Sequence, residues 1–222
     1  MNIHHEILVL IFSIAFVGQI YANDCLSVNN LVVESNIMVD NNKLTDKEYV
    51  KQILHKASEI DKRIRSDDYM QCENLSSAME AIDENNTVSL KKVLSAYSWL
   101  QISTFGDVTV SDAWTIVQHS QDLNLQHKVL FIMEQLLASH EANKQQFALL
   151  YDRVALNYIT LGVKQKYGTQ YMIEDNTVVM QPCEGTIAQI DERRKDFGLP
   201  PVHEYEKILK SIFLANPNQA SK

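Results

Sequence analysis

The sequence predicts a mainly α-helical fold: a single domain of about seven helices with one small β-hairpin near residues 169–181. Apolar residues recur at helical spacing through most of the chain. The pattern changes to strand-like alternation near residues 169–181, and no linker, internal repeat or low-complexity segment divides the chain. We therefore expect one helical domain over residues 44–215, followed by a polar tail over residues 216–222.

Residues 1–22 have the pattern of a secretory signal peptide. Ile7 to Ile20 form an apolar run that is shorter than the roughly 20 residues of a membrane-spanning helix. The small residue Ala22 suits the position before a cleavage site. Because residues 1–6 contain no Lys or Arg, a membrane anchor is the alternative. We expect cleavage after Ala22, export to the periplasm or the medium, and no stable membrane insertion of the mature chain.

Charge and cysteine content narrow the functional classes. The formal net charge is −8 and no basic stripe occurs, so neither nucleic acid nor an anionic membrane is an expected partner. Three cysteines, Cys25, Cys72 and Cys183, allow at most one intramolecular disulfide after export. A Cys25–Cys72 bridge is preferred, because it would fasten the amino terminus. A catalytic cysteine is the alternative, although none of the three lies at a helix start or beside a histidine.

The predicted elements follow in chain order. The Asn-rich residues 23–43 lack sustained periodicity and are expected to form a partly ordered leader. A capping box at Thr45–Glu48 starts the first helix, and a helical stretch near residues 75–86 and another at 89–97 precede an aromatic loop at 98–110. The remaining helices are expected at residues 111–120, 123–140, 144–161, 186–198 and 202–214, and the strands at 169–173 and 177–181, joined at Asp175-Asn176.

Between Ser111 and Gln170 several polar residues lie inside apolar helical patterns. Gln126 shares a helix face with Leu130, Met133 and Leu137. Asp152 has apolar residues one turn away on both sides, so it needs a partner, and the adjacent Arg153 points about 100° away. The partner is expected from His119 or from residues 165–170. We predict that folding brings together Gln118, His119, Gln126, Asp152, Arg153, Gln165, Tyr167 and Gln170.

This set indicates acid–base or binding chemistry. Neither an HExxH motif nor clustered histidines occur, so we expect no metal and no cofactor. Neither a nucleophile elbow nor a glycine-rich phosphate loop occurs. His119 can act as a general base oriented by Asp152, with the other members as candidate ligand-binding residues. The structural alternative is a buried polar network that fixes the register of the helices.

The order of these motifs supports a family resemblance. Gln118-His119, Asp152-Arg153 and Tyr167-Gly168-Thr169-Gln170, followed by Arg193-Arg194, occur in a chain segment from about Asp61 to Tyr205 that resembles DUF6624, an uncharacterised bacterial domain family. Ser98-Trp99-Leu100 departs from the Gly-Trp-Pro that this family tends to have. The resemblance implies bacterial origin and supports the grouping of the polar residues, but it brings no established activity or ligand.

Three functions follow as hypotheses. The leading one is an exported domain that binds a small ligand or a peptide in a polar pocket built by the Gln-His, Asp-Arg and Tyr-Gly-Thr-Gln segments. The first alternative is a hydrolase or transferase with His119 and Asp152 as its acid–base pair. The second is a protein-interaction factor, for immunity or envelope assembly, in which the polar set is purely structural. The sequence identifies neither the ligand nor the oligomeric state.

Overall fold

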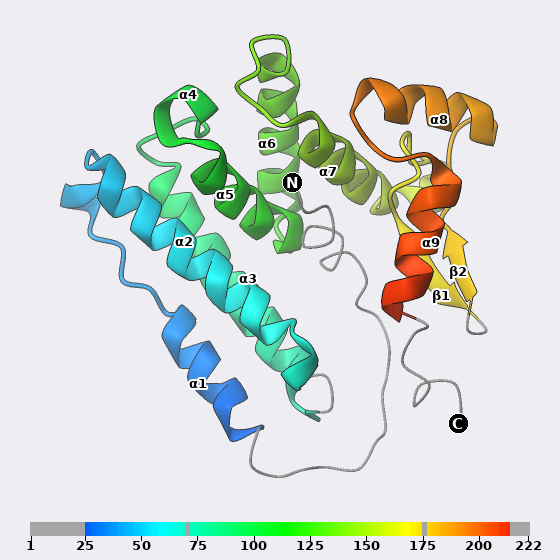
Figure 1. The fold of residues 1–222 in the computed structure, drawn as a ribbon. Coiled ribbons are helices and arrows are strands. Elements are labelled where there is room, and N and C mark those ends of the chain that lie inside the picture. Colours follow the sequence, from blue (N-terminus) through cyan, green and yellow to red (C-terminus); the bar gives the residue numbers. More distant parts are fainter. Residues whose placement is uncertain (1–24, 70–71, 175–176, 214–222) are drawn as a thin grey trace. The chain divides into compact units, whose positions relative to one another are not determined.

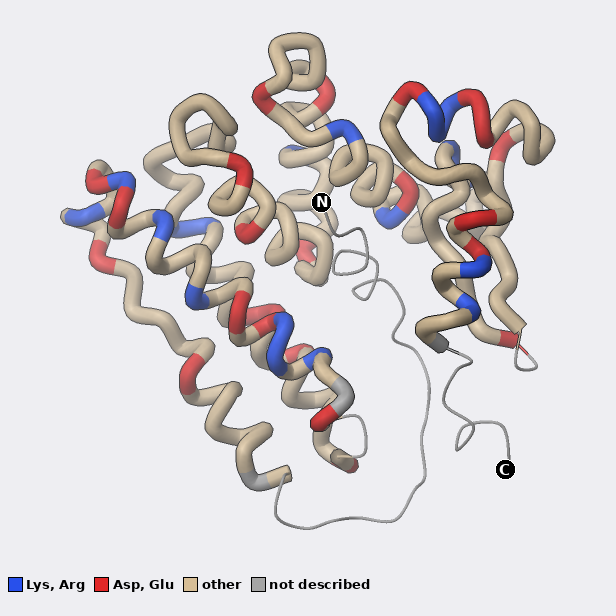
Figure 2. Tube along the Cα trace, in the orientation of Figure 1, with Lys and Arg blue, Asp and Glu red and all other residues tan. Residues whose placement is uncertain are grey.

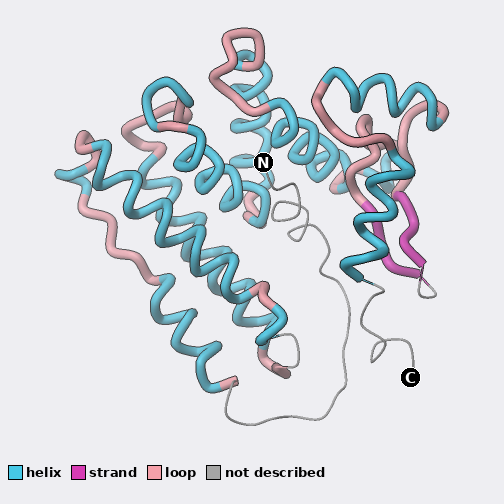
Figure 3. The backbone as a smooth tube through the Cα atoms, viewed as in Figure 1, coloured by secondary structure: helices cyan, strands magenta, loops and turns pink. Residues whose placement is uncertain are grey.

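A computed structural model describes residues 25–69, 72–174 and 177–213. The described residues form nine α-helices and one two-stranded hairpin, so the predicted mainly helical fold with one hairpin is confirmed (Figures 1 and 3). They fall into two compact units, an amino-terminal unit over residues 25–142 and a carboxy-terminal unit over residues 143–213. Each unit is described by itself, and the single domain expected over residues 44–215 stays a prediction.

The amino-terminal unit is built on α2, which packs against both α3 and α5. Its core includes the buried residues Val50, Leu54, Leu90 and Val117. Acidic and basic residues both occur along α2, as Figure 2 shows. The helices are α1 (Leu26–Ser35), α2 (Lys47–Ile64), α3 (Leu75–Val93), α4 (Ile102–Phe105), α5 (Asp107–His119) and α6 (Leu123–Leu136).

The leader contains a helix that the sequence pattern did not predict. Val28 and Leu31 of α1 are buried in an apolar cluster that also contains Ile60, Ile64 and Ile82. A disulfide joins Cys25 to Cys72, which confirms the preferred pairing. Ten residues rich in Val and Asn have little helical stability of their own. Burial and the disulfide therefore stabilise α1 in a way that local periodicity could not indicate.

Several helix boundaries also differ from prediction. The cap of α2 is Asp46, one residue after the predicted Thr45, and its carboxylate accepts hydrogen bonds from the backbone of Glu48 and Tyr49. The expected break near residues 85–86 is wrong, because α3 is continuous. Asn86 donates its side-chain amide to the Ala57 carbonyl at 3.1 Å, so tertiary bonding keeps this residue inside the helix. Helix α5 begins at Asp107, within the predicted aromatic loop.

The carboxy-terminal unit packs α9 against β2 and α8. The antiparallel register pairs Tyr171 with Met180 and Glu174 with Thr177, and the predicted Asp175-Asn176 turn lies outside the described residues. The predicted capping box of Thr186 and Gln189 is present at the start of α8. Its elements are α7 (Lys144–Leu156), a short 3-10 turn (Ile159–Leu161), β1 (Tyr171–Glu174), β2 (Thr177–Met180), α8 (Ile187–Asp196) and α9 (Val202–Phe213).

Helix α7 ends five residues before the predicted Leu161, and Gly162 follows the 3-10 turn in the left-handed conformation. Across the three described ranges, we find no helix with the length and apolar character needed to cross a membrane.

We expect the Cys25→Ser, Cys72→Ser double variant to lose about 2–4 kcal/mol in free energy of unfolding. The bridge closes a loop across a sequence separation of 47 residues, and removing it enlarges the unfolded ensemble. Urea denaturation under oxidising conditions measures this loss. Cys183→Ser, which removes the partly buried free thiol, is the matched control and should change stability much less. Equal stability of wild type and double variant would contradict the role given to the bridge.

Candidate functional site

A cluster of four ionisable side chains is buried in the amino-terminal unit. It consists of Asp61, Arg65, Asp83 and His119, which we call the buried ionic cluster. Asp61 lies on α2, Arg65 directly follows that helix, Asp83 lies on α3 and His119 ends α5. Asp61 and Arg65 are four residues apart and therefore share one helix face. Because α2 contacts both α3 and α5, this face receives Asp83 and His119.

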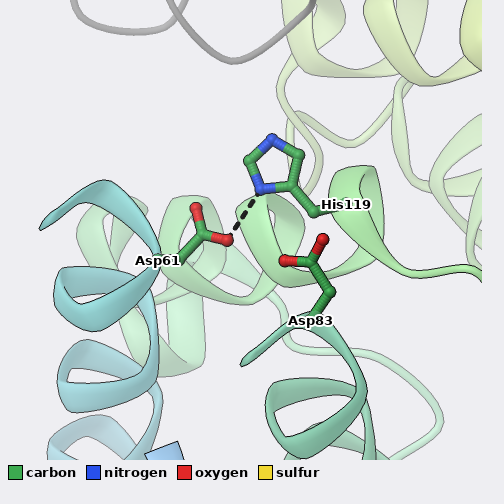
Figure 4. Close-up of side chains that lie close together, drawn as sticks. All are labelled: Asp61, Asp83 and His119. Atoms are coloured by element: carbon green, nitrogen blue, oxygen red, sulfur yellow. Dashed lines mark hydrogen bonds and ion pairs between the residues drawn. The ribbon is translucent and has the colours of Figure 1, made fainter. Parts of the chain in front are cut away.

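One oxygen atom joins the cluster together. Asp61 Oδ1 accepts a hydrogen bond from Arg65 Nη1 at 2.5 Å and lies 2.8 Å from His119 Nδ1 (Figure 4). Arg65 Nη2 donates to both oxygens of Asp83 at 2.8 Å. Asp61 Oδ2 is buried and has no hydrogen-bond partner among the described residues. Arg65 thus bridges two carboxylates, and one of these holds the imidazole.

The two carboxylates differ in acidity. Burial alone would raise the pKa of Asp61, but the nearby charges of His119 and Arg65 outweigh it and hold that pKa below its ordinary value. Asp61 is therefore a carboxylate at neutral pH, and Nδ1 of His119 carries the proton in their hydrogen bond. Burial, together with the Asp61 charge, raises the pKa of Asp83 to about 7 against the opposing attraction of Arg65.

The ligand atoms of Asp61, Asp83 and His119 lie within 4.8 Å of one another, which is a spacing that a metal ion could use. However, the Arg65 guanidinium already binds both carboxylates, and His119 Nδ1 already bonds to Asp61. A metal would have to replace these charge-assisted bonds and leave a buried arginine without its partners. The donor set therefore fits an internal ion network better than a metal centre.

A second histidine–aspartate pair joins the same two helices. His55 Nδ1 of α2 lies 3.1 Å from Asp112 Oδ2 of α5, and Lys62 lies 3.5 Å from the other oxygen. Asp112 is buried, whereas the His55 side chain is 60% exposed and that of His119 is 3% exposed. The chain thus offers two histidine–aspartate pairs that differ mainly in how well solvent reaches the imidazole.

Two glutamines predicted for the site are also buried in this unit. Gln126 Nε2 donates to the carbonyls of Val117 and Ser120 at 3.2 and 2.9 Å, so it links α6 to the end of α5. Gln118 is 1% exposed, and neither its Oε1 nor its Nε2 has a hydrogen-bond partner among the described residues. The sequence pattern thus identified two buried amides, and Gln126 forms its hydrogen bonds with nearby backbone carbonyls.

Asp152 obtains its partners from residues 165–170, one of its two expected sources. Its carboxylate accepts hydrogen bonds from the backbone of Lys166 at 2.7 Å, Tyr167 at 3.1 Å and Thr169 at 2.9 Å, and from the Thr169 hydroxyl at 2.9 Å. Burial raises the pKa of Asp152, and these hydrogen bonds oppose the shift. The carboxylate therefore acts as an anchor for the loop that follows α7.

Three of the other four expected residues of this unit belong to the same loop. Gln165 Nε2 donates to the carbonyls of Gln170 and Gln181 at 3.0 and 2.6 Å, and Gln165 Oε1 accepts from the Gln170 backbone at 2.9 Å. Arg194 Nη1 donates to the carbonyl of Tyr167 at 2.7 Å. Arg153 is partly buried on α7. Gln165, Tyr167 and Gln170 are thus held by bonds within the carboxy-terminal unit.

Sequence reasoning missed Asp61, Arg65 and Asp83. A signal was present, because Asp61 falls one turn after Ala57 at the border of the apolar stripe of α2. Asp83 likewise follows the buried Ile82 and lies one turn after Met79. An acidic residue at such a border can also lie in solvent, and tertiary packing alone decides between the two.

We expect the free energy of unfolding to fall as the pH rises from 5 to 8, and to fall less in Asp83→Asn. Between an unfolded value near 3.9 and the folded value of about 7, the folded protein holds a proton on Asp83 that the unfolded chain has released. The stabilisation is fully present below pH 4 and is lost above pH 7, with an upper limit of about 4 kcal/mol.

Urea denaturation at pH 5, 6, 7 and 8 compares the two proteins. Asp152 is present in both proteins, so its contribution to the pH dependence cancels in the comparison. The lowered pKa of Asp61 affects the free energy of unfolding only below this pH range. Glu80→Gln, an exposed acid on the same helix, is the control and should keep the wild-type slope. The same slope in Asp83→Asn as in wild type would refute the assignment.

Comparison with known proteins places the chain in a family without giving it an activity. Neither the curated proteins nor the solved structures contain a match. The sequence matches the family of unknown function DUF6624 over residues 48–215, which includes the four members of the buried ionic cluster and the Asp152 loop. Because the match covers most of the chain, the protein belongs to the DUF6624 family.

Proposed function

We propose that this protein is an exported hydrolase or transferase in which His119 is the general acid–base group and Asp61 orients it. The observation that carries the proposal is the 2.8 Å contact between His119 Nδ1 and Asp61 Oδ1. A carboxylate in this position fixes the tautomer of the ring and stabilises the imidazolium that forms when the second nitrogen takes a proton. Asp61 thereby replaces Asp152 as the acid–base partner of His119.

The surroundings of the pair support the electrostatic part of the proposal. In Figure 4 the second ring nitrogen of His119 points away from both carboxylates. Only 3% of the side chain is exposed, so bulk solvent does not surround the ring. Exclusion of bulk solvent also strengthens the electrostatic support that Asp61 gives the ring. His119 would take the proton of a water molecule as that water attacks the substrate.

A second candidate function is the binding of a small amide-bearing ligand or a peptide. The buried Gln118 amide favours it, because both of its polar atoms have no partner among the described residues. A ligand with one donor and one acceptor would satisfy both atoms. Gln126, Gln165 and Gln170, which were expected to share this task, make hydrogen bonds within their own units.

Export is part of the proposal. The Cys25–Cys72 disulfide supports it, because such bridges persist in oxidising compartments and are rare in the cytosol of most cells. The apolar run of residues 7–20 supports it from the sequence. A periplasmic or secreted location follows for the mature chain.

We expect His119→Ala to lower hydrolytic activity at least 100-fold, because general acid–base catalysis typically contributes this much or more. The mature protein is assayed against chromogenic carboxylic esters, phosphate esters and peptide anilides. Asp61→Asn should also lose activity. His55→Ala is the matched control, since it removes the exposed histidine of the other pair and should leave the rate unchanged.

Several results would contradict this proposal. Equal rates in wild type and His119→Ala, or no turnover of any substrate by the wild type, would reject His119 as the acid–base group. Loss of activity in His55→Ala with retention in His119→Ala would assign the chemistry to the His55–Asp112 pair instead.

We expect the protein expressed with its own leader in a bacterial host to begin at Asn23 in the periplasm or the medium. Cleavage after Ala22 produces this terminus. Intact mass and amino-terminal sequencing of the fractionated protein measure it. A full-length chain in the cytosol, or retained in the membrane, would contradict export as proposed.

A further inference from the structure

Two donors share one acceptor in the buried ionic cluster. Asp61 Oδ1 lies within hydrogen-bonding distance of both Arg65 Nη1 and His119 Nδ1, while Oδ2 of the same carboxylate has no partner among the described residues. The guanidinium and the imidazole therefore donate to the same oxygen atom. Any change in how tightly Arg65 binds this oxygen changes how strongly the oxygen holds the imidazole proton.

Asp83 competes with Asp61 for the hydrogen bonds of the Arg65 guanidinium. Arg65 Nη2 donates to both oxygens of Asp83 at 2.8 Å, and Nη1 reaches Asp61 at 2.5 Å. A planar guanidinium can serve two acceptors at once in this fixed geometry, which a lysine ammonium on a flexible stem reproduces poorly. Where Asp83 is ionised, its charge offsets part of the arginine charge that Asp61 would otherwise experience.

We propose that Arg65 and Asp83 are positioning residues that set the basicity of His119 through the shared oxygen of Asp61. This inference rests on the proposed function and names two further residues of the same site. The charged groups facing the imidazole are Asp61 and Arg65 from the α2 segment and Asp83 from α3. Lys62 and His55 each interact with Asp112 in the neighbouring pair.

The proposal requires changes of opposite sign on the two sides of Arg65. Arg65→Met removes the competing cation, so Asp61 holds the imidazolium more tightly and the titration midpoint of His119 rises by about one pH unit. Asp83→Asn removes the second carboxylate, so Asp61 experiences the full charge of Arg65. The titration midpoint of His119 therefore falls by about half a pH unit or more. Arg65→Lys keeps the positive charge but loses the planar set of guanidinium donors. The His119 midpoint in this variant should move in the same direction as in Arg65→Met.

The experiment is a pH titration of the mature protein followed by histidine ring ¹H–¹⁵N spectra. The His119 signal is identified by its loss in His119→Gln. Arg63→Met is the matched control, because it removes an arginine from the exposed face of α2, where Arg63 pairs with Glu34 at 3.0 Å. Its His119 midpoint should equal that of wild type. Near-ultraviolet circular dichroism checks that each variant is folded.

Unchanged midpoints in Arg65→Met and Asp83→Asn, or shifts of the same sign, would overturn the proposal. If Arg65→Met does not fold, Asp83→Asn and Arg65→Lys still predict shifts in opposite directions, and equal behaviour of these two would overturn it. Because the readout is a titration, it stays separate from the proposed activity. An active His119→Ala protein rejects the catalytic role, whereas a wild-type midpoint in all variants rejects the positioning role.

Discussion

The double engagement of Arg65 with Asp61 and Asp83 is the constraint on which the amino-terminal unit depends. Ionisable groups are costly to bury unless each is paired, and the cluster pairs them only when α2, α3 and α5 meet in one register. A shift of α3 along α2 would leave Asp83 or Arg65 buried without a partner. Apolar packing along these helices tolerates many registers, so the ion network adds specificity that hydrophobic contact does not supply by itself.

The carboxy-terminal unit buries a carboxylate by a different means. Asp152 accepts hydrogen bonds from the backbone and hydroxyl groups of one loop, and among the described residues no charged side chain bonds to it. The two carboxylates therefore have pKa shifts of opposite sign. Burial raises the pKa of Asp152, whereas the neighbouring cations lower that of Asp61. Neutral donors fix a loop but do not themselves titrate. Asp152 is therefore well suited to hold residues 166–169 in place.

Helical periodicity predicted most elements of the fold because it reflects burial on one face, which is a local property of the sequence. It failed at α1, where a disulfide and tertiary burial stabilise a short helix, and at Asn86, where a tertiary hydrogen bond stabilises the middle of α3. The same limit applies to the site. A buried Asp152 could be predicted from its flanking residues, as could its need for partners from residues 165–170. Asp61 and Asp83 could not be assigned, since an acid at the border of an apolar stripe has the same sequence pattern whether it is paired or solvated.

Burial can thus be predicted from sequence for a polar residue with apolar neighbours on both sides, but the partner decides what the residue can do. Gln126, Gln165 and Asp152 bond to backbone groups, whose protonation does not change near neutral pH. His119 bonds to a carboxylate that is itself linked through Arg65 to a second carboxylate with a pKa of about 7. Proton transfer needs groups whose charge can change near the working pH. This difference is the reason why we propose acid–base chemistry for the buried ionic cluster and a structural role for the Asp152 loop.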